Sequence, residues 1–168
     1  MSEVTVRPLD DGDLAEVLER NNAEVPAVGE LDADRLAGLV AMAESALAAD
    51  LDGELAGFVI ALPPGVAYTS PNYRWFSRRS DDFVYIDRVV VLPRGRGLGI
   101  GRVLYDAVVA RTDAPVLLAE VNTEPRNDVS LAFHDRYGFT AVGEAAPYGD
   151  GTRVRYLERS LRASGAQE

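Results

Sequence analysis

The order of predicted strands and helices indicates an α/β protein with a mixed central sheet of about seven strands, flanked by helices on both faces. Two observations support this prediction. In the first half of the chain, Asp52-Gly53 separates two apolar strands and is a typical hairpin turn. Further on, an apolar strand over residues 83–92 leads through a glycine-rich turn and a helix to a second buried strand. A hairpin makes antiparallel neighbours and a crossover makes parallel ones, so the sheet should be mixed.

The remaining elements follow from periodicity and from cap residues. A strand is expected over residues 4–7, and a helix that carries Leu14, Val17 and Leu18 inward comes next. A second helix begins at Asp32. Its expected apolar face is formed by Leu36, Leu39, Val40, Ala43 and Leu47. The other expected elements are strands near 48–51 and over 54–62, 116–121, 140–144 and 153–161, a helix to about 111 and a helix over 129–137.

Composition limits the class of protein. The 168 residues, 47% of them apolar, suffice for one domain over 1–168 with an ordered core of about 4–161. There is no cysteine and only one histidine, which excludes disulfides and the usual zinc sites, so no metal is expected. A net charge of -10 argues against nucleic-acid binding. No apolar run approaches the ~20 residues of a membrane span, and no signal peptide is evident, so we expect a cytoplasmic protein.

A glycine-rich stretch carries the strongest functional signal. Strand residues Val89, Val90 and Val91 lead to a turn of alternating glycines and then to a helix. Such a turn points several backbone N–H groups into one space, and the helix N-terminus adds positive charge, so the expected ligand is a phosphate or pyrophosphate. The spacing fits neither the Walker loop nor the dinucleotide fingerprint. The residues of this turn are Arg96, Gly97, Leu98, Gly99, Ile100, Gly101 and Arg102.

Two motifs together resemble the GNAT superfamily of N-acetyltransferases. The first is Arg96-Gly97-Leu98-Gly99-Ile100-Gly101, which is similar to the family's acyl-CoA pyrophosphate loop. The second runs from Asn127 through Ser130 and His134 to Gly138-Phe139, and the family's order of elements extends over residues 4–161. The resemblance implies acetyl-CoA as cofactor, with its pantetheine arm along residues 89–91 and its pyrophosphate on the amides of residues 96–101. It also places Asn127 and Ser130 at the cofactor.

Acetyl transfer to an amine needs a general base and a proton for the departing thiolate. Asp87 and Glu120 are the candidate bases, because each is an acid in an otherwise apolar strand. The alternative is that either acid pairs with Arg88 or another arginine. His134 stands where the resemblance places the family's tyrosine acid, and an imidazole can protonate a thiolate. Tyr137 is the rival acid.

A stretch over residues 63–82 is expected to be a long loop rich in aromatic residues. It either forms a wall of the acceptor site or places its aromatic side chains in the core or a dimer interface. The segment over residues 21–31 is a second loop with apolar residues beside the expected pocket. The candidate substrate contacts from these two loops are Asn22, Tyr73, Trp75 and Arg78.

These observations favour an enzyme that transfers acetyl from acetyl-CoA to a primary amine of a small molecule or peptide, by direct attack. The absence of cysteine excludes a cysteinyl acyl-enzyme. The competing hypothesis is a catalytically idle acyl-CoA-binding or regulatory domain, favoured by the missing tyrosine at position 134. Arginines near the aromatic loop indicate an acceptor with a carboxylate or phosphate, whereas the acidic composition indicates a cation. We expect no nucleic-acid or membrane partner and leave a homodimer open.

Overall fold

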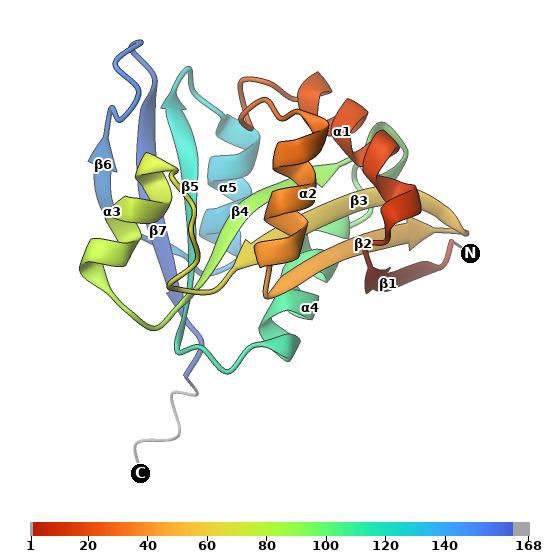
Figure 1. Cartoon of the computed structure of the whole chain (residues 1–168). Helices are drawn as coiled ribbons and strands as arrows, with labels where there is room; N and C mark the ends of the chain where they lie inside the picture. Colours follow the sequence, from red (N-terminus) through yellow and green to blue (C-terminus); the bar gives the residue numbers. More distant parts are fainter. Residues whose placement is uncertain (1, 163–168) are drawn as a thin grey trace. The chain divides into compact units, whose positions relative to one another are not determined.

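The computed structural model describes residues 2–162, which form a seven-stranded sheet and five α-helices (Figure 1). The strands are β1 (Val4–Pro8), β2 (Ser45–Leu51), β3 (Glu54–Leu62), β4 (Val84–Val91), β5 (Val116–Glu124), β6 (Thr140–Ala145) and β7 (Arg153–Ser160). The helices are α1 (Leu14–Ala23), α2 (Ala33–Met42), α3 (Pro71–Arg79), α4 (Ile100–Arg111) and α5 (Asp128–Arg136), with short 3₁₀ turns η1 (Asp11–Asp13) and η2 (Pro93–Gly95).

The sheet has the strand order β1-β2-β3-β4-β5-β7-β6. Strands β1, β2 and β3 are antiparallel neighbours, as are β5, β7 and β6. The pair β4–β5 is parallel, with Val84 opposite Leu117 and Tyr85 opposite Leu118. The predicted mixed sheet of about seven strands is therefore confirmed.

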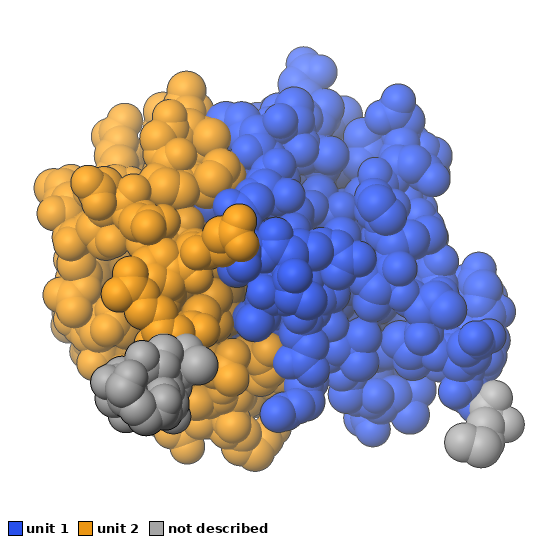
Figure 2. All heavy atoms as spheres, turned by 90° about the horizontal axis from the view of Figure 1, so that it is seen from below, with its two compact units in different colours: residues 1–62, 87–112 blue, residues 63–86, 113–168 orange. Residues whose placement is uncertain are grey.

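The chain divides into two compact units, shown in different colours in Figure 2. Unit 1 contains residues 1–62 and 87–112, and unit 2 contains residues 63–86 and 113–168. Strand β4 contributes its first three residues to unit 2 and the rest to unit 1. The prediction of a single domain stays a prediction.

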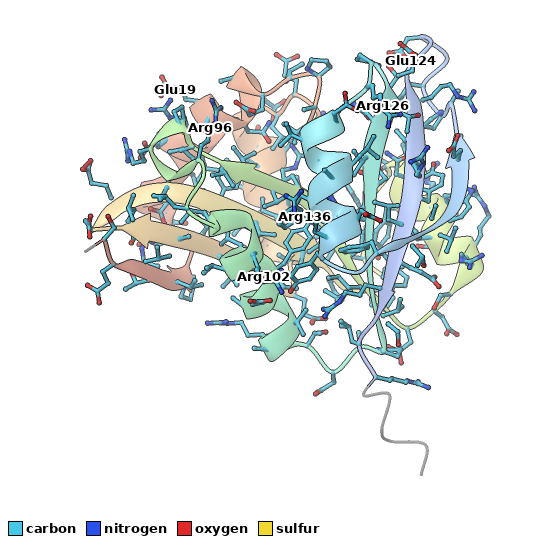
Figure 3. The ribbon with its side chains drawn as sticks, turned by 180° about the vertical axis from the view of Figure 1, so that it is seen from behind. Glu19, Arg96, Arg102, Glu124, Arg126 and Arg136 are labelled. Carbon is cyan, nitrogen blue, oxygen red and sulfur yellow. The ribbon has the colours of Figure 1, made fainter. Side chains whose placement is uncertain are left out.

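In unit 1, helices cover both faces of the strands, with α1 and α2 on one face and α4 on the other (Figures 1 and 3). The N-terminus of α4 packs closely on β3 because Gly57 has no side chain. A Cβ atom at Gly57 would lie 2.8 Å from Ile100 Cγ2 and 2.9 Å from the Val90 carbonyl oxygen. This close contact with β3 fixes the position of the first turn of α4 beside the end of β4.

In unit 2, α3 and α5 lie on opposite faces of β5 and β7 (Figures 1 and 3). The core here is aromatic. Phe76, Tyr85 and Tyr156 are fully buried, and the Phe76 ring contacts both tyrosine rings at centroid distances of 5.7 and 5.2 Å. Within residues 2–162, no helix is long and apolar enough to cross a membrane.

The second helix is shorter than its apolar periodicity predicted. Helix α2 ends at Met42, and Ala43 has extended backbone angles. The amide of Glu44 then donates to the Ala61 carbonyl, and Leu47 lies in β2 opposite Val59. The prediction of Ala43 and Leu47 on a helix face was wrong, because pairing with β3 determines the backbone there.

The long loop predicted over residues 63–82 contains helix α3. Ser70 caps it by accepting a hydrogen bond from the Tyr73 amide, and Pro71 occupies its first turn. Both residues favour a helix N-terminus. This Ser-Pro start is the sequence signal that the loop prediction overlooked.

Candidate active site

The glycine stretch of unit 1 forms a tight turn that leads directly into a helix. Gly97 and Gly99 have φ angles of 78° and 75°, in the left-handed region that favours glycine. Gly99 is the N-cap of α4, so the amides of Ile100 and Gly101 fall in the first helical turn, where an α-helix offers no carbonyl partner. Such donors, together with the positive end of a helix dipole, are typical of an anion site.

Backbone hydrogen bonds within the turn fix its shape. The Gly95 amide donates to the Leu92 carbonyl at 2.9 Å, and the Leu98 amide donates to the Gly95 carbonyl at 3.3 Å. The Arg96 amide donates to the Pro93 carbonyl at 3.3 Å. The Arg96 and Leu98 amides, which were among those predicted to bind a pyrophosphate, therefore already donate hydrogen bonds within the turn.

The arginines of this region differ in what they contact. Arg94 donates to the Leu55 carbonyl at 2.6 Å and so ties the turn to β3. The Arg96 side chain is 59% exposed and lies 3.5 Å from Glu24. Arg102 follows in the first turn of α4 (Figure 3). Arg96 and Arg102 thus bring positive charge to the glycine turn.

Strand β4 approaches this turn with alternating burial. Val90 is buried, whereas Val89 and Val91 are half-buried. The turn, α4 and these strand residues all belong to unit 1, so the structure brings together the strand and loop residues predicted for the cofactor.

The candidate base Asp87 is part of a buried ion pair. Its Oδ2 accepts from Arg88 Nε at 2.7 Å, and the two side chains are 3% and 6% exposed. Arg88 also donates to Asn21 Oδ1 and to the Gly29 carbonyl, each at 2.9 Å. A buried pair of this kind is costly to break, by about 3–5 kcal/mol. The pairing with Arg88 that the sequence left open for Asp87 is therefore present.

Asn22 closes the loop that follows α1. Its Nδ2 donates to the Leu31 carbonyl at 2.9 Å, and its Oδ1 accepts from the Leu31 amide at 3.0 Å. The two hydrogen bonds between Asn22 and Leu31, together with the hydrogen bond from Arg88 to the Gly29 carbonyl, fix the segment between α1 and α2 in place. A contact of Asn22 with substrate stays a prediction.

In unit 2, the candidate base Glu120 has a different environment. Tyr85 donates its hydroxyl hydrogen to Glu120 Oε1 at 2.6 Å. Tyr156 lies opposite Glu120 in the β5–β7 register. Burial and the nearby Glu120 and Tyr148 raise the pKa of Tyr156 to about 12. Glu120 is half-buried. It therefore lies between Tyr85, which donates a hydrogen bond to it, and Tyr156, which stays neutral at physiological pH.

The second motif forms the start of helix α5, where Asn127 is the N-cap. Its Oδ1 accepts from the Ser130 amide at 3.2 Å. His134, in the next turn, is 3% exposed, and its Nδ1 lies 2.8 Å from the Ser130 carbonyl oxygen. A carbonyl only accepts, so Nδ1 carries the hydrogen and Nε2 the lone pair. Burial lowers the pKa of His134, although the Ser130 carbonyl opposes this shift.

The predicted substrate residues near α3 have three different settings. Tyr73 is buried and donates to the Pro63 carbonyl at 2.6 Å, and burial raises its pKa. Trp75 is half-buried, and its ring stacks on the Tyr156 ring with the two centroids 4.1 Å apart. Arg78 is exposed on the last turn of α3. For Tyr73, placement in the core is the alternative that the structure favours.

Sequence reasoning missed a group of polar side chains around Glu120. Tyr85 lies in the mostly apolar strand β4, and Tyr156 lies in β7 among alternating charged and apolar residues, so both resembled ordinary core residues. Asn72 joins two tyrosine hydroxyls, accepting from Tyr156 at 2.8 Å and donating to Tyr148 at 2.6 Å. Because these four residues lie as many as 84 positions apart, no local pattern could have grouped them.

Comparison with known proteins points to one family. The model of the GNAT acetyltransferase family matches residues 13–139. No curated protein matches the sequence. Ard1 from Thermoplasma volcanium has a similar structure, with a TM-score of 0.77, 18% identity, and coverage of 95% of this chain and 99% of that one.

Two further solved structures have the same fold. For yncA from Salmonella typhimurium, solved with its cofactor acetyl-CoA, the TM-score is 0.70 at 20% identity, over 96% of this chain and 95% of that one. For NAA60 from Arabidopsis thaliana, in complex with a bisubstrate analogue, the TM-score is 0.73 at 20% identity, over 94% of this chain and 98% of that one.

Proposed function

The chain belongs to the GNAT acetyltransferase family, and we propose that it transfers acetyl from acetyl-CoA to a primary amine of a small molecule or peptide by direct attack. Family membership makes the protein an acyltransferase that uses acetyl-CoA. The class of acceptor, the residues and the order of proton transfers are the parts that we propose.

The glycine turn is the observation that carries this proposal. Left-handed backbone at Gly97 and Gly99 and first-turn amides at Ile100 and Gly101 fit a diphosphate, which needs several donors in a small space. Arg96 and Arg102 would add charge, and Val89, Val90 and Val91 would contact the pantetheine arm. Asn127 and Ser130 complete the residues proposed for the cofactor. When bound, acetyl-CoA supplies the activated acetyl thioester.

We assign the general base to Glu120. An alkyl amine with a pKa of ~10.4 is mostly protonated at neutral pH and must lose a proton before it attacks. Glu120 would accept that proton, with Tyr85 holding the carboxylate in place through the 2.6 Å hydrogen bond. Asp87 is less suited, because its carboxylate is already paired with Arg88.

His134 would transfer the second proton, which passes from the amine to the departing thiolate. Its Nε2 carries a lone pair at neutral pH, since Nδ1 holds the hydrogen that faces Ser130. Nε2 can therefore accept the proton that the amine loses as the amide forms. Because burial lowers the pKa of His134, the imidazolium is a ready donor to a thiolate, whose conjugate acid has a pKa of ~8.5.

Direct attack is favoured because the chain has no cysteine to form a thioester with the acetyl group. Trp75 and Arg78, on the partly exposed side of α3, are the proposed acceptor contacts. A single domain over 1–168 and a homodimer remain predictions.

The test is release of free CoA from acetyl-CoA in the presence of pooled amines, amino acids and peptides, with acetyl-CoA binding measured separately. We expect turnover with one pool and loss of that turnover in Glu120→Gln. Tight acetyl-CoA binding without turnover in any pool would favour an idle acyl-CoA-binding domain. Failure to bind acetyl-CoA would contradict the role of the glycine turn.

A further inference from the structure

A salt bridge joins the glycine turn to the segment between α1 and α2. Arg96 Nη2, which extends from the turn (Figure 3), lies 3.5 Å from Glu24 Oε2. Both residues belong to unit 1, and their side chains are 59% and 37% exposed. Arg94, in contrast, donates to the Leu55 carbonyl on β3. The arginine at the start of the predicted pyrophosphate loop therefore has a carboxylate of the same chain as its partner.

A buried network fixes the backbone that carries Glu24. The Glu24 amide donates to the Asn21 carbonyl at 3.0 Å. Asn21 is fully buried, and its side chain donates to the Gly29 carbonyl and accepts from Arg88 Nη1, each at 2.9 Å. Because this network holds the chain on both sides of Glu24, its carboxylate reaches Arg96 from a fixed backbone.

The position of Glu24 conflicts with the ligand proposed for the turn. The first amides of α4 and the Arg96 guanidinium are the groups assigned to a diphosphate. A guanidinium that pairs with a carboxylate is less available to a phosphate, because both anions use the same N–H donors. Glu24 also repels any second anion that approaches Arg96. The pair must therefore weaken or open when a diphosphate binds.

Opening of the pair needs no change in the core. Both side chains are partly exposed, so rotation of either one separates them while the hydrogen bonds of Asn21 stay intact. An exposed ion pair is a weak interaction that changes an equilibrium constant by about two- to fivefold. Glu24 would thus lower the affinity for a diphosphate without preventing its binding.

We propose that the Glu24–Arg96 pair is an autoinhibitory contact, in which Glu24 competes with the diphosphate of the cofactor for Arg96 and is released when acetyl-CoA binds. This inference rests on the proposed function, since it concerns the cofactor turn of the same site. Acetyl-CoA and the product CoA carry the same diphosphate, so Glu24 should weaken the binding of both equally. The contact would then help the product to leave.

The experiment is calorimetric titration of acetyl-CoA and of CoA into the wild type and four variants. Glu24→Gln removes the charge but keeps the shape of the side chain, and Arg96→Gln removes the guanidinium. The third variant combines both changes. The control is Glu30→Gln, which makes the same change of charge at an exposed position of the same segment.

We expect Glu24→Gln to bind both ligands about two- to fivefold more tightly than the wild type, and Glu30→Gln to bind them as the wild type does. Arg96→Gln should bind them more weakly. In that background Glu24→Gln should add no gain, because the carboxylate acts through Arg96. The gain should also shrink at high salt, which screens exposed charges.

Unchanged affinity in Glu24→Gln would overturn the inference and leave the proposed function intact. The same holds if the gain is as large without Arg96, or as large in Glu30→Gln, since net charge alone would then explain it. Tight binding of acetyl-CoA by the wild type without turnover of any amine would overturn the proposed transfer but not this inference. Failure of the wild type to bind either ligand would overturn both.

Discussion

The two units differ in what their proposed sites are made of. In unit 1, the cofactor turn consists mainly of backbone, with Gly97 and Gly99 in left-handed conformations and the first amides of α4 as donors. In unit 2, the proposed acceptor side consists of side chains, with Glu120, Tyr85 and Tyr156 on three strands and Asn72 on α3. We propose that the first kind of site binds acetyl-CoA and that the second kind determines which amine reacts.

This difference predicts how each side responds to substitution. A backbone site tolerates loss of a side chain but not a change in backbone angles. A side-chain site keeps its backbone and loses the function of the group that is removed. Cofactor affinity should therefore respond to a backbone change at the glycine turn, and turnover to loss of the Glu120 carboxylate.

The largest expected effect comes from Glu120→Gln. Removal of the base should lower kcat by about 100-fold or more, without changing the affinity for acetyl-CoA. Asp87→Asn should instead lower the free energy of unfolding, by about 3 kcal/mol, because it disrupts the buried pair with Arg88. Steady-state kinetics and urea denaturation of both variants separate the two acids. The opposite pattern would move the base to Asp87.

The next effect concerns the glycine turn. Gly99→Ala places a Cβ at a φ of 75° with nothing within 4 Å, so the change is purely one of backbone strain, about 1–2 kcal/mol. We expect acetyl-CoA binding to weaken about tenfold. Gly53→Ala is the matched control, since Gly53 has a φ of 86° and equally open space, in the β2–β3 turn. Equal loss of affinity in both variants would show that only general stability had changed.

A smaller effect is expected from Tyr85→Phe. The ring keeps its place in the core, but Glu120 loses the donor at 2.6 Å. A carboxylate without this donor is less favoured in its charged form, so the acidic limb of the kcat/KM profile should move to higher pH and kcat should fall about fivefold. A pH profile of unchanged shape would exclude a positioning role for Tyr85.

The smallest effect is the pH dependence of stability due to His134, the only histidine of the chain. Its pKa in the folded protein is lowered by burial from the ordinary 6.5. As the pH falls below 6.5, the unfolded chain binds this proton before the folded protein does, so stability decreases. Urea denaturation at several pH values should show a weaker decrease in His134→Gln. An identical slope in both proteins would contradict the burial effect.

Much of the fold was predictable because most local signals agree with the final structure. The apolar run of β3, the glycine turn before α4 and the Asn127 cap of α5 each determine an element by themselves. Errors arose where a long-range contact determines the backbone. Leu47 fits a helical period, yet its segment pairs with β3.

The candidate site, like the fold, was only partly predictable from the sequence. The glycine turn is contiguous in sequence, so a motif reveals it. The surroundings of Glu120 come from β4, α3 and β7, and their tyrosines look like core residues until the fold brings them to one place. The ring nitrogen that carries the hydrogen in His134 also depends on the Ser130 carbonyl, which only the helix places at 2.8 Å.

The most direct test is calorimetric titration of acetyl-CoA into the wild type, Gly99→Ala and Glu120→Gln. We expect the wild type and Glu120→Gln to bind with equal affinity and Gly99→Ala to bind about tenfold more weakly. Binding by Gly99→Ala as tight as that of the wild type, or an equal loss in Glu120→Gln, would contradict a backbone-built cofactor site that is separate from the acceptor side chains.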